Sequence, residues 1–157
     1  MYWTIWIALV LLVAGEAGRR RGFGGGSPPA WAWPAFAAGA VLSAIHVVLA
    51  MSIAHGWSHD SAVAATASQT KAVYGVDWGG GVYANYAFVA VWALDAWRWR
   101  VGVARAGPGP DALTWTIRLF FFVMILNGAV IFAAGPRWIL GAAVVALLMW
   151  IWRPLHQ

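Results

Sequence analysis

Three of the four histidines of this chain lie within residues 45–60, in the segment IHVVLAMSIAHGWSHD. His55 and His59 are four residues apart, a spacing that places two side chains on one face of a helix. Two imidazoles in that arrangement can bind one metal ion, and the neighbouring carboxylate of Asp60 suits a borderline divalent ion such as zinc. The alternative is a pair of interfacial histidines bonded to water and backbone, because Gly56 can break the helix between them.

His46 lies nine residues before His55, about half a turn out of phase at 3.6 residues per turn, so one straight helix cannot aim both at one ion. It falls near the middle of a long apolar run, where an ionisable group is a functional-site hypothesis. His46 could be a single axial ligand of a haem or share a haem between subunits. Alternatively, it is a neutral histidine that hydrogen-bonds across a helix contact, beside the small residues Gly39, Ser43 and Ala50.

Other polar side chains also fall inside apolar segments. Opposite charges buried at similar depth are expected to pair, because an unpaired charge in hydrocarbon costs several kcal/mol. We expect an Asp95–Arg118 contact that acts as a structural clamp, with Glu16 as the competing partner of Arg118. Asn127 is expected to hydrogen-bond between helices, a contribution of roughly 1 kcal/mol. Asn85 could line an outward-facing cavity together with nearby tyrosines.

Familiar catalytic motifs do not occur in the sequence. There is no GxSxG, and no serine–histidine pair has an evident orienting acid. The chain has no cysteine, which excludes disulfides and thiolate ligands. The glycines within residues 22–26 are not followed by the Lys-Ser/Thr of a phosphate-binding loop. The absence of these motifs favours a non-enzymatic protein but leaves the enzyme question open.

The composition indicates what must surround these residues. The chain is 62% hydrophobic and 10% charged, whereas a soluble domain is about 25% charged. A chain of 157 residues cannot hide so much apolar surface from water, so the lipid bilayer is the expected solvent and partner. The net charge of +5 does not indicate nucleic acid, because the arginines cluster in short loops and form no basic face with interleaved aromatics.

Five apolar segments approach the roughly 20 residues that a membrane span needs. We predict an all-helical, multi-pass membrane bundle that forms a single domain over residues 1–157. The first segment is interpreted as an uncleaved anchor, because its arginines follow the apolar run instead of preceding it. Ser27 and Asp111 are expected to cap the second and fourth segments. The predicted spans are residues 2–18, 31–57, 82–99, 113–134 and 137–153.

The distribution of positive charge predicts the orientation. In a five-span arrangement seven arginines fall on one side, and only Lys71 and Arg137 fall on the other. Under the positive-inside rule the N-terminus is therefore outside and the C-terminus inside, in a bacterial-type inner membrane. The seven are Arg19, Arg20, Arg21, Arg98, Arg100, Arg105 and Arg153.

Residues 58–81 form the only long connection between spans, on the outer side. Ser58 or Asp60 could start a helix there and Gly75 could end it, and we expect this short amphipathic helix to lie on the outer face of the bundle. Three functions remain open. The first is a non-enzymatic component of a membrane complex, built with other subunits or with copies of itself. The second is a metal- or haem-binding protein with an outward-facing His/Asp site, and the third is a small oligomeric transporter or membrane enzyme with an outward cavity.

Overall fold

The computed structural model describes residues 2–102 and 109–154, and over these ranges the chain forms helices and no β-strand. The predicted all-helical class is confirmed for this part of the chain. Short segments complete the elements: the π-helices η1 (Ala50–Ala54) and η3 (Leu126–Ile131) and the 3₁₀ turn η4 (Gly135–Arg137). The α-helices are α1 (Tyr2–Phe23), α2 (Ala32–Leu49), α3 (His59–Tyr74), α4 (Gly81–Arg100), α5 (Ala112–Ile125) and α6 (Trp138–Ile151).

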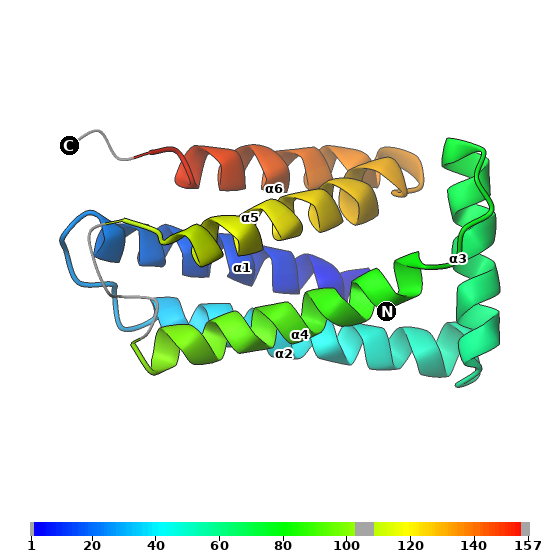
Figure 1. Cartoon of the computed structure of the whole chain (residues 1–157), viewed down its shortest axis with the longest axis horizontal. Coiled ribbons are helices and arrows are strands. Elements are labelled where there is room, and N and C mark those ends of the chain that lie inside the picture. The colour runs from blue at the N-terminus through cyan, green and yellow to red at the C-terminus, as the bar shows by residue number, and fades with distance from the viewer. Residues whose placement is uncertain (1, 103–108, 155–157) are drawn as a thin grey trace.

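Five helices lie side by side, and the sixth crosses one end of them. Figure 1 shows α1, α2, α4, α5 and α6 along the long axis, with successive helices running in opposite directions, and α3 lying across the bundle. We call the end that carries α3 the α3 end. The opposite end, the arginine end, carries the C-terminal ends of α1, α4 and α6 and the arginines that belong to them.

Local capping chemistry sets the ends of α3. The Ser58 hydroxyl accepts a hydrogen bond from the Ser61 backbone N–H at 3.2 Å, which satisfies one of the free donors at the helix start. Gly75 ends the helix with φ 74°, a left-handed conformation that glycine adopts without strain. The helix predicted in the outer connection is therefore present and ends at the predicted glycine.

The two other predicted caps have different outcomes. Asp111 accepts a hydrogen bond from the Thr114 backbone N–H at 2.7 Å and caps α5, as predicted. The predicted cap at Ser27 is wrong. α2 begins at Ala32 without a side-chain cap, because the two prolines that follow Ser27 lie in the preceding loop and the Ala32 N–H bonds to a proline carbonyl instead.

The two longest apolar helices both end in a π-helix at the α3 end. α2 continues into η1 and α5 continues into η3, which gives helical segments of 23 residues (Ala32–Ala54) and 20 residues (Ala112–Ile131). Both are long and apolar enough to cross a membrane, and the apolar segment Gly135–Ile151 is shorter. Two helices of the described chain are thus candidate membrane spans by length and composition.

The core forms where small residues let helices approach closely. A Cβ on Gly15 of α1 would lie 2.6 Å from Phe36 Cβ of α2, so that position has no room for a side chain. Phe36 and Trp92 have no exposed surface, and their rings meet edge-to-face with centroids 5.9 Å apart. Such pairs add stability beyond the area they bury. This aromatic core fixes how α1, α2 and α4 are rotated about their axes.

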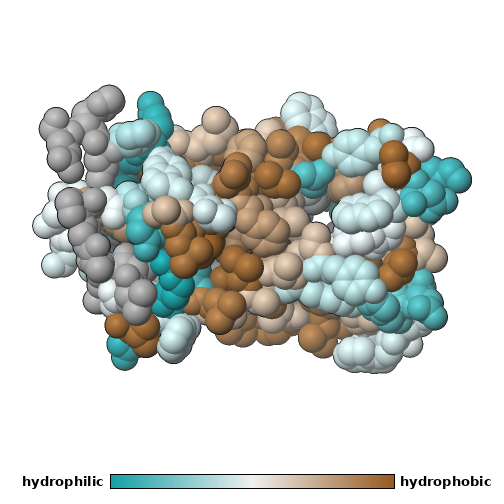
Figure 2. Space-filling model, viewed as in Figure 1, coloured by the Kyte–Doolittle hydropathy of each residue, from teal (hydrophilic) through white to brown (hydrophobic). Residues whose placement is uncertain are grey.

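The surface of the bundle carries large apolar side chains. Figure 2 shows an apolar region over the middle of the visible face, with hydrophilic residues gathered toward the two ends. Val41 of α2 is 59% exposed, Leu119 of α5 is 64% exposed and Leu140 of α6 is 55% exposed. Contiguous apolar surface of this kind marks membrane or protein contact.

Candidate functional site

A network of ion pairs is buried between the helices at the arginine end. Glu16 of α1 accepts hydrogen bonds from Arg118 of α5, at 2.7 Å from Nη2 and 3.0 Å from Nε. Arg19 of α1 donates to Asp95 of α4 at 2.6 Å and to Glu16 at 3.2 Å. Arg98 of α4 donates to the other Asp95 oxygen at 2.9 Å. Carboxylates and guanidiniums therefore alternate from α5 through α1 to α4.

Helix geometry brings these groups together. Glu16 and Arg19 are three residues apart on α1, and Asp95 and Arg98 are three apart on α4, so each helix presents one acid and one base on the same face. The α6 end joins the network through Trp152, whose indole N–H donates to Glu16 Oε2 at 2.6 Å. Four helices are thus tied to one carboxylate pair.

The network is buried, and its charges balance. Glu16 is 2% exposed, Asp95 is 1% exposed and Arg118 is 4% exposed. Arg98 also bonds at 3.1 Å to Asp111, whose side chain is 48% exposed, which brings the total to three arginines and three carboxylates. Removing charges from water costs several kcal/mol per ion, and good geometry with opposite charges offsets that cost.

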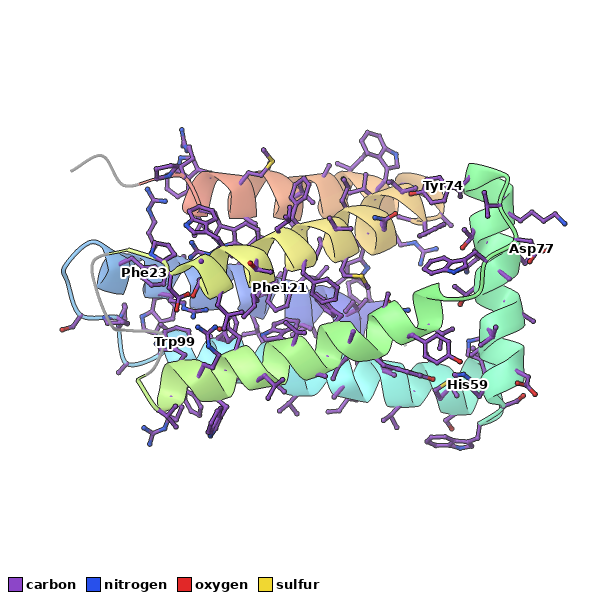
Figure 3. The ribbon with its side chains drawn as sticks, in the orientation of Figure 1. Phe23, His59, Tyr74, Asp77, Trp99 and Phe121 are labelled. Atoms are coloured by element: carbon purple, nitrogen blue, oxygen red, sulfur yellow. The ribbon has the colours of Figure 1, made fainter. Side chains whose placement is uncertain are left out.

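Aromatic rings cover the two most buried guanidiniums. Arg19 lies over the Trp99 ring at 5.2 Å from the centroid. Arg118 lies over Phe23 at 5.2 Å and over Trp115 at 5.3 Å, and Figure 3 shows Phe23 and Trp99 at this end of the bundle. Rings within about 6 Å attract a cation and shield it from water. The arrangement therefore favours ion pairs that are fixed in place.

At the solvent-exposed rim of the network, Asp111 has a pKa below its usual range. Hydrogen bonding with Thr114, which donates its backbone N–H at 2.7 Å, favours the ionised carboxylate. The positive charge of Arg98 acts in the same direction. Asp111 therefore stays ionised under mildly acidic conditions and performs two roles, as the cap of α5 and as the last carboxylate of the network.

The predicted Asp95–Arg118 contact is wrong. Arg118 pairs with Glu16, the competing partner, and Asp95 pairs with Arg19 and Arg98. The reason is that α1 remains helical through Phe23, which carries Arg19 into the bundle beside Asp95. Sequence reasoning treated Arg19 and Arg98 as loop cations. The signal that could have found them is the three-residue spacing of each arginine from an acid on its own helix.

The histidines at the α3 end do not form the predicted metal pair. His55 follows η1, and the backbone then turns through Gly56 (φ 53°) and Trp57 (φ 64°) before α3 begins at His59. His55 and His59 therefore do not share a helix face, and Asp60 lies exposed in the first turn of α3. Within residues 2–102 and 109–154 no three His, Cys, Asp or Glu side chains come together to hold a metal ion.

His59 instead fastens α3 to α4. Its Nε2 lies 3.1 Å from the Tyr83 hydroxyl, and its Nδ1 lies 3.4 Å from the Tyr86 hydroxyl. At the other end of α3, the Tyr74 hydroxyl donates to Asn127 Oδ1 of η3 at 2.6 Å. Figure 3 shows His59 and Tyr74 toward opposite ends of α3. The predicted hydrogen bond of Asn127 between helices is therefore present, and it helps to hold α3 across the bundle.

His46 and Asn85 lie in different surroundings. The Nδ1 atom of half-buried His46 is 3.1 Å from the Thr4 hydroxyl of α1, so His46 hydrogen-bonds across the α1–α2 contact. The small residues expected on its face are packed, since Gly39 and Ser43 are buried. Asn85 is exposed on the surface of α4. Tyr83 and Tyr86, which were expected to line a cavity with Asn85, contact His59 instead.

Comparisons with protein-family models, with curated proteins and with solved structures find no match to this chain. The chemistry of the chain must therefore be inferred from its own residues. The ion-pair network contains Glu16, Asp95 and Arg118, the three charged groups that the sequence analysis discussed inside apolar segments. With Trp152 it joins four helices.

Proposed function

We propose that this chain is a five-span protein of a bacterial-type inner membrane, with its N-terminus outside and its C-terminus inside, and that it serves as a non-enzymatic component of a membrane complex. In this proposal the spans are α1, α2 with η1, α4, α5 with η3, and α6. α3 then lies on the outer surface, and the arginine end faces the cytoplasm.

The surface of the bundle supports a lipid environment. Large apolar side chains are exposed along the helices, in numbers that water would not tolerate in a stable monomer. Tryptophans lie toward both ends, where their rings favour the membrane–water boundary: Trp3, Trp31, Trp57, Trp78, Trp97, Trp138 and Trp150 are all more than half exposed.

The charge distribution supports the orientation. The C-terminal ends of α1 and α4 carry arginines at the arginine end, and Arg153 follows α6 there. Lys71 lies on α3 and Arg137 lies at the start of α6, both toward the α3 end. Cationic loops are retained on the cytoplasmic side during insertion. Arg105, which the sequence also assigns to this side, lies outside the described residues.

The observation that carries the non-enzymatic assignment is the closed state of the ion-pair network. Its acids and bases hydrogen-bond to one another under aromatic rings. A catalytic acid or base must reach a substrate atom within hydrogen-bond distance. Glu16 and Asp95 are at most 2% exposed, and their oxygens already accept hydrogen bonds from arginines. This arrangement supports a structural clamp that sets the relative positions of four helices.

The topology can be tested by cysteine labelling, because the chain has no cysteine of its own. Lys71→Cys and Arg100→Cys each place one thiol at an exposed position, on opposite ends of the bundle. A membrane-impermeant maleimide should label position 71 in intact spheroplasts and position 100 only after lysis. Labelling of position 100 from outside contradicts the orientation.

Membership of a complex needs a separate measurement. Solubilisation in the mildest effective detergent should recover the chain at its natural expression level in one assembly of constant mass, larger than a monomer in its micelle. Light scattering coupled to size exclusion gives that mass. A monomer at every concentration, from membranes that contain all other natural proteins, contradicts the proposal.

A further inference from the structure

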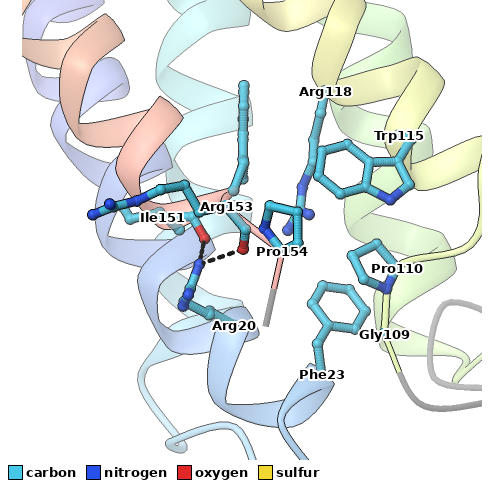
Figure 4. A pocket seen from close by; sticks show the side chains of 10 residues that line it. Arg20, Phe23, Gly109, Pro110, Trp115, Arg118, Ile151, Arg153 and Pro154 are labelled. Atoms are coloured by element: carbon cyan, nitrogen blue, oxygen red, sulfur yellow. Dashed lines mark hydrogen bonds between the residues drawn. The ribbon is translucent and has the colours of Figure 1, made fainter. Parts of the chain in front are cut away.

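A cavity opens at the arginine end, beside the ion-pair network. It has a volume of about 330 Å³, at the lower end of the roughly 300–1,000 Å³ of small-molecule sites. Figure 4 shows Trp115 and Arg118 of α5 on one side of the cavity, Arg20 of α1 on another side and Phe23 below. The described lining residues include no carboxylate: they are Arg20, Phe23, Gly109, Pro110, Trp115, Arg118, Ile151, Trp152, Arg153 and Pro154.

Two arginines in this lining keep unused hydrogen-bond donors. Arg20 donates through Nη1 to the backbone carbonyls of Ile151 and Arg153, which fixes the guanidinium against the C-terminal end of α6. Its Nη2 and Nε make no hydrogen bond within the described residues. Arg118 donates through Nε and Nη2 to Glu16, and its Nη1 likewise has no partner in the described ranges. Both guanidiniums are therefore held in place with N–H groups to spare.

The electrostatic balance of the cavity is positive. The charge of Arg118 is balanced by Glu16, but Arg20 is bonded only to carbonyl oxygens in the described chain. Arg153 also lines the cavity, and its guanidinium stacks on the Trp150 ring, 5.7 Å from the centroid. An oxyanion with several acceptor oxygens matches forked guanidinium donors better than any neutral group does.

The remaining walls are aromatic and aliphatic. Trp115, Trp152 and Phe23 line the cavity together with two prolines, and Trp115 is 40% exposed toward the surroundings of the bundle. A site that joins arginine donors to apolar walls suits an amphiphile whose anionic group is attached to a hydrocarbon part. Basic pockets between membrane helices on the cytoplasmic side bind the headgroups of anionic lipids.

We infer that this cavity binds the phosphate of an anionic phospholipid, such as phosphatidylglycerol, from the inner leaflet. Arg20 and Arg118 hold the phosphate oxygens, and Trp115 and Phe23 pack against the glycerol and the start of the acyl chains. The inference rests on the proposed orientation, which places the arginine end at the inner leaflet. Arg118 and Trp152 also bond to Glu16. A bound headgroup would therefore lie next to two residues of the ion-pair network.

The test uses the full chain in a neutral detergent, with lipid binding followed by native mass spectrometry. The probes are phosphatidylglycerol, phosphatidylcholine, glycerol 3-phosphate and inorganic phosphate. The central variant is Arg20→Gln. Its matched control is Arg21→Gln, because Arg21 is adjacent, exposed and outside the cavity lining, and its replacement changes the net charge equally. Arg20→Lys keeps the charge but removes the fork of donors.

Phosphatidylglycerol should bind about tenfold more tightly than phosphatidylcholine, because both lipids carry a phosphate but the arginines of the cavity repel the choline cation of phosphatidylcholine. Arg20→Gln should weaken phosphatidylglycerol binding by about tenfold, the size expected for a lost hydrogen bond to a charged group. Arg20→Lys should weaken it several-fold, and Arg21→Gln should leave it unchanged. If Arg20→Gln does not fold, Arg20→Lys against Arg21→Gln makes the same comparison.

Three results would overturn the inference. Equal affinity for phosphatidylglycerol and phosphatidylcholine removes the anion preference. Equal losses in the Arg20 and Arg21 variants show that only net charge matters. Glycerol 3-phosphate or inorganic phosphate binding as tightly as phosphatidylglycerol assigns the cavity to a soluble phosphate compound instead. Lipid binding in detergent does not depend on the orientation of the chain in a membrane. A failure to bind phosphatidylglycerol would therefore leave the proposed orientation unaffected, and labelling that contradicts the orientation would leave binding in detergent unaffected.

Discussion

Glu16→Gln is the substitution that separates a buried clamp from a surface ion pair. It preserves the shape of the side chain but removes the charge that Arg118 and Trp152 share at Oε2, at 2.7 Å and 2.6 Å. Arg118, 4% exposed, is then left in the bundle without a counter-charge. Removing one partner of a buried ion pair costs about 3–5 kcal/mol, because the remaining charge stays desolvated. We expect a loss of this size in the free energy of unfolding.

The chain provides its own control pair. Lys71 and Asp77 form an ion pair at 3.4 Å with side chains 64% and 65% exposed. Exposed pairs contribute at most about 1 kcal/mol, so Asp77→Asn removes the same type of charge with a small effect. Unfolding of each variant by sodium dodecyl sulfate, in mixed micelles and followed by circular dichroism, gives the two free energies for comparison.

A double substitution sharpens the argument. Replacing Arg118 by Met in the Glu16→Gln background removes the stranded charge, and replacing both partners of a buried pair by groups of similar volume is often nearly neutral. The double variant should therefore recover much of the stability that Glu16→Gln loses. A loss below about 1 kcal/mol in Glu16→Gln, or losses that simply add in the double variant, would refute the view that this network is dry and closed.

Three further predictions test the packing and the ends of helices. Gly15→Ala should lower the unfolding free energy by roughly 1–3 kcal/mol because its methyl group has no room, whereas Gly128→Ala, whose Cβ would meet nothing within 4 Å, should be tolerated in the same assay. Tyr74→Phe removes the hydrogen bond to Asn127, so amide exchange at the C-terminal end of α3 should accelerate while α5 is unaffected. The pKa of Asp111 in the folded protein lies below its usual range. The stability that Asp111 contributes is therefore fully present above its pKa in the unfolded chain, and it is lost as the pH falls through its pKa in the folded protein. Asp111→Asn should therefore flatten the acid side of the stability profile, and an unchanged slope would contradict this role.

Features that depend on neighbouring residues in the chain were predictable from the sequence. The cap at Ser58, the glycine end of α3 and the Asp111 cap each depend on side chains within a few positions. The all-helical class follows from apolar runs too long and too continuous for strands. Ser27 shows the limit of such reasoning, because two successive prolines can lie before the helix as easily as within its first turn.

The pairings in the network were not predictable because they depend on helix rotation. Depth along a span suggested that Asp95 would meet Arg118, but depth does not specify which face of α4 turns toward α1. That rotation is fixed by packing, such as Gly15 against Phe36. The histidine prediction failed for a different reason: the four-residue rule assumes a continuous helix, and Trp57 adopts a positive φ that bulky residues rarely take.

The network also changes how the orientation signal must be counted. Arg19 and Arg98 are bound to carboxylates, which leaves Arg21, Arg100 and Arg153 as the exposed cations of the described arginine end. The chain inserts before the network folds, and carboxylates contribute little to the positive-inside rule. Every arginine should therefore contribute to orientation during insertion, but only the exposed arginines can be replaced without unfolding the bundle.

The double variant Arg21→Gln, Arg100→Gln should therefore keep the stability of the parent and weaken its orientation bias. Impermeant labelling of Lys71→Cys in that background measures this, since a mixed population should leave part of position 71 unlabelled from outside. Complete labelling of position 71 would mean that the remaining arginines of that side suffice to orient the chain without Arg21 and Arg100.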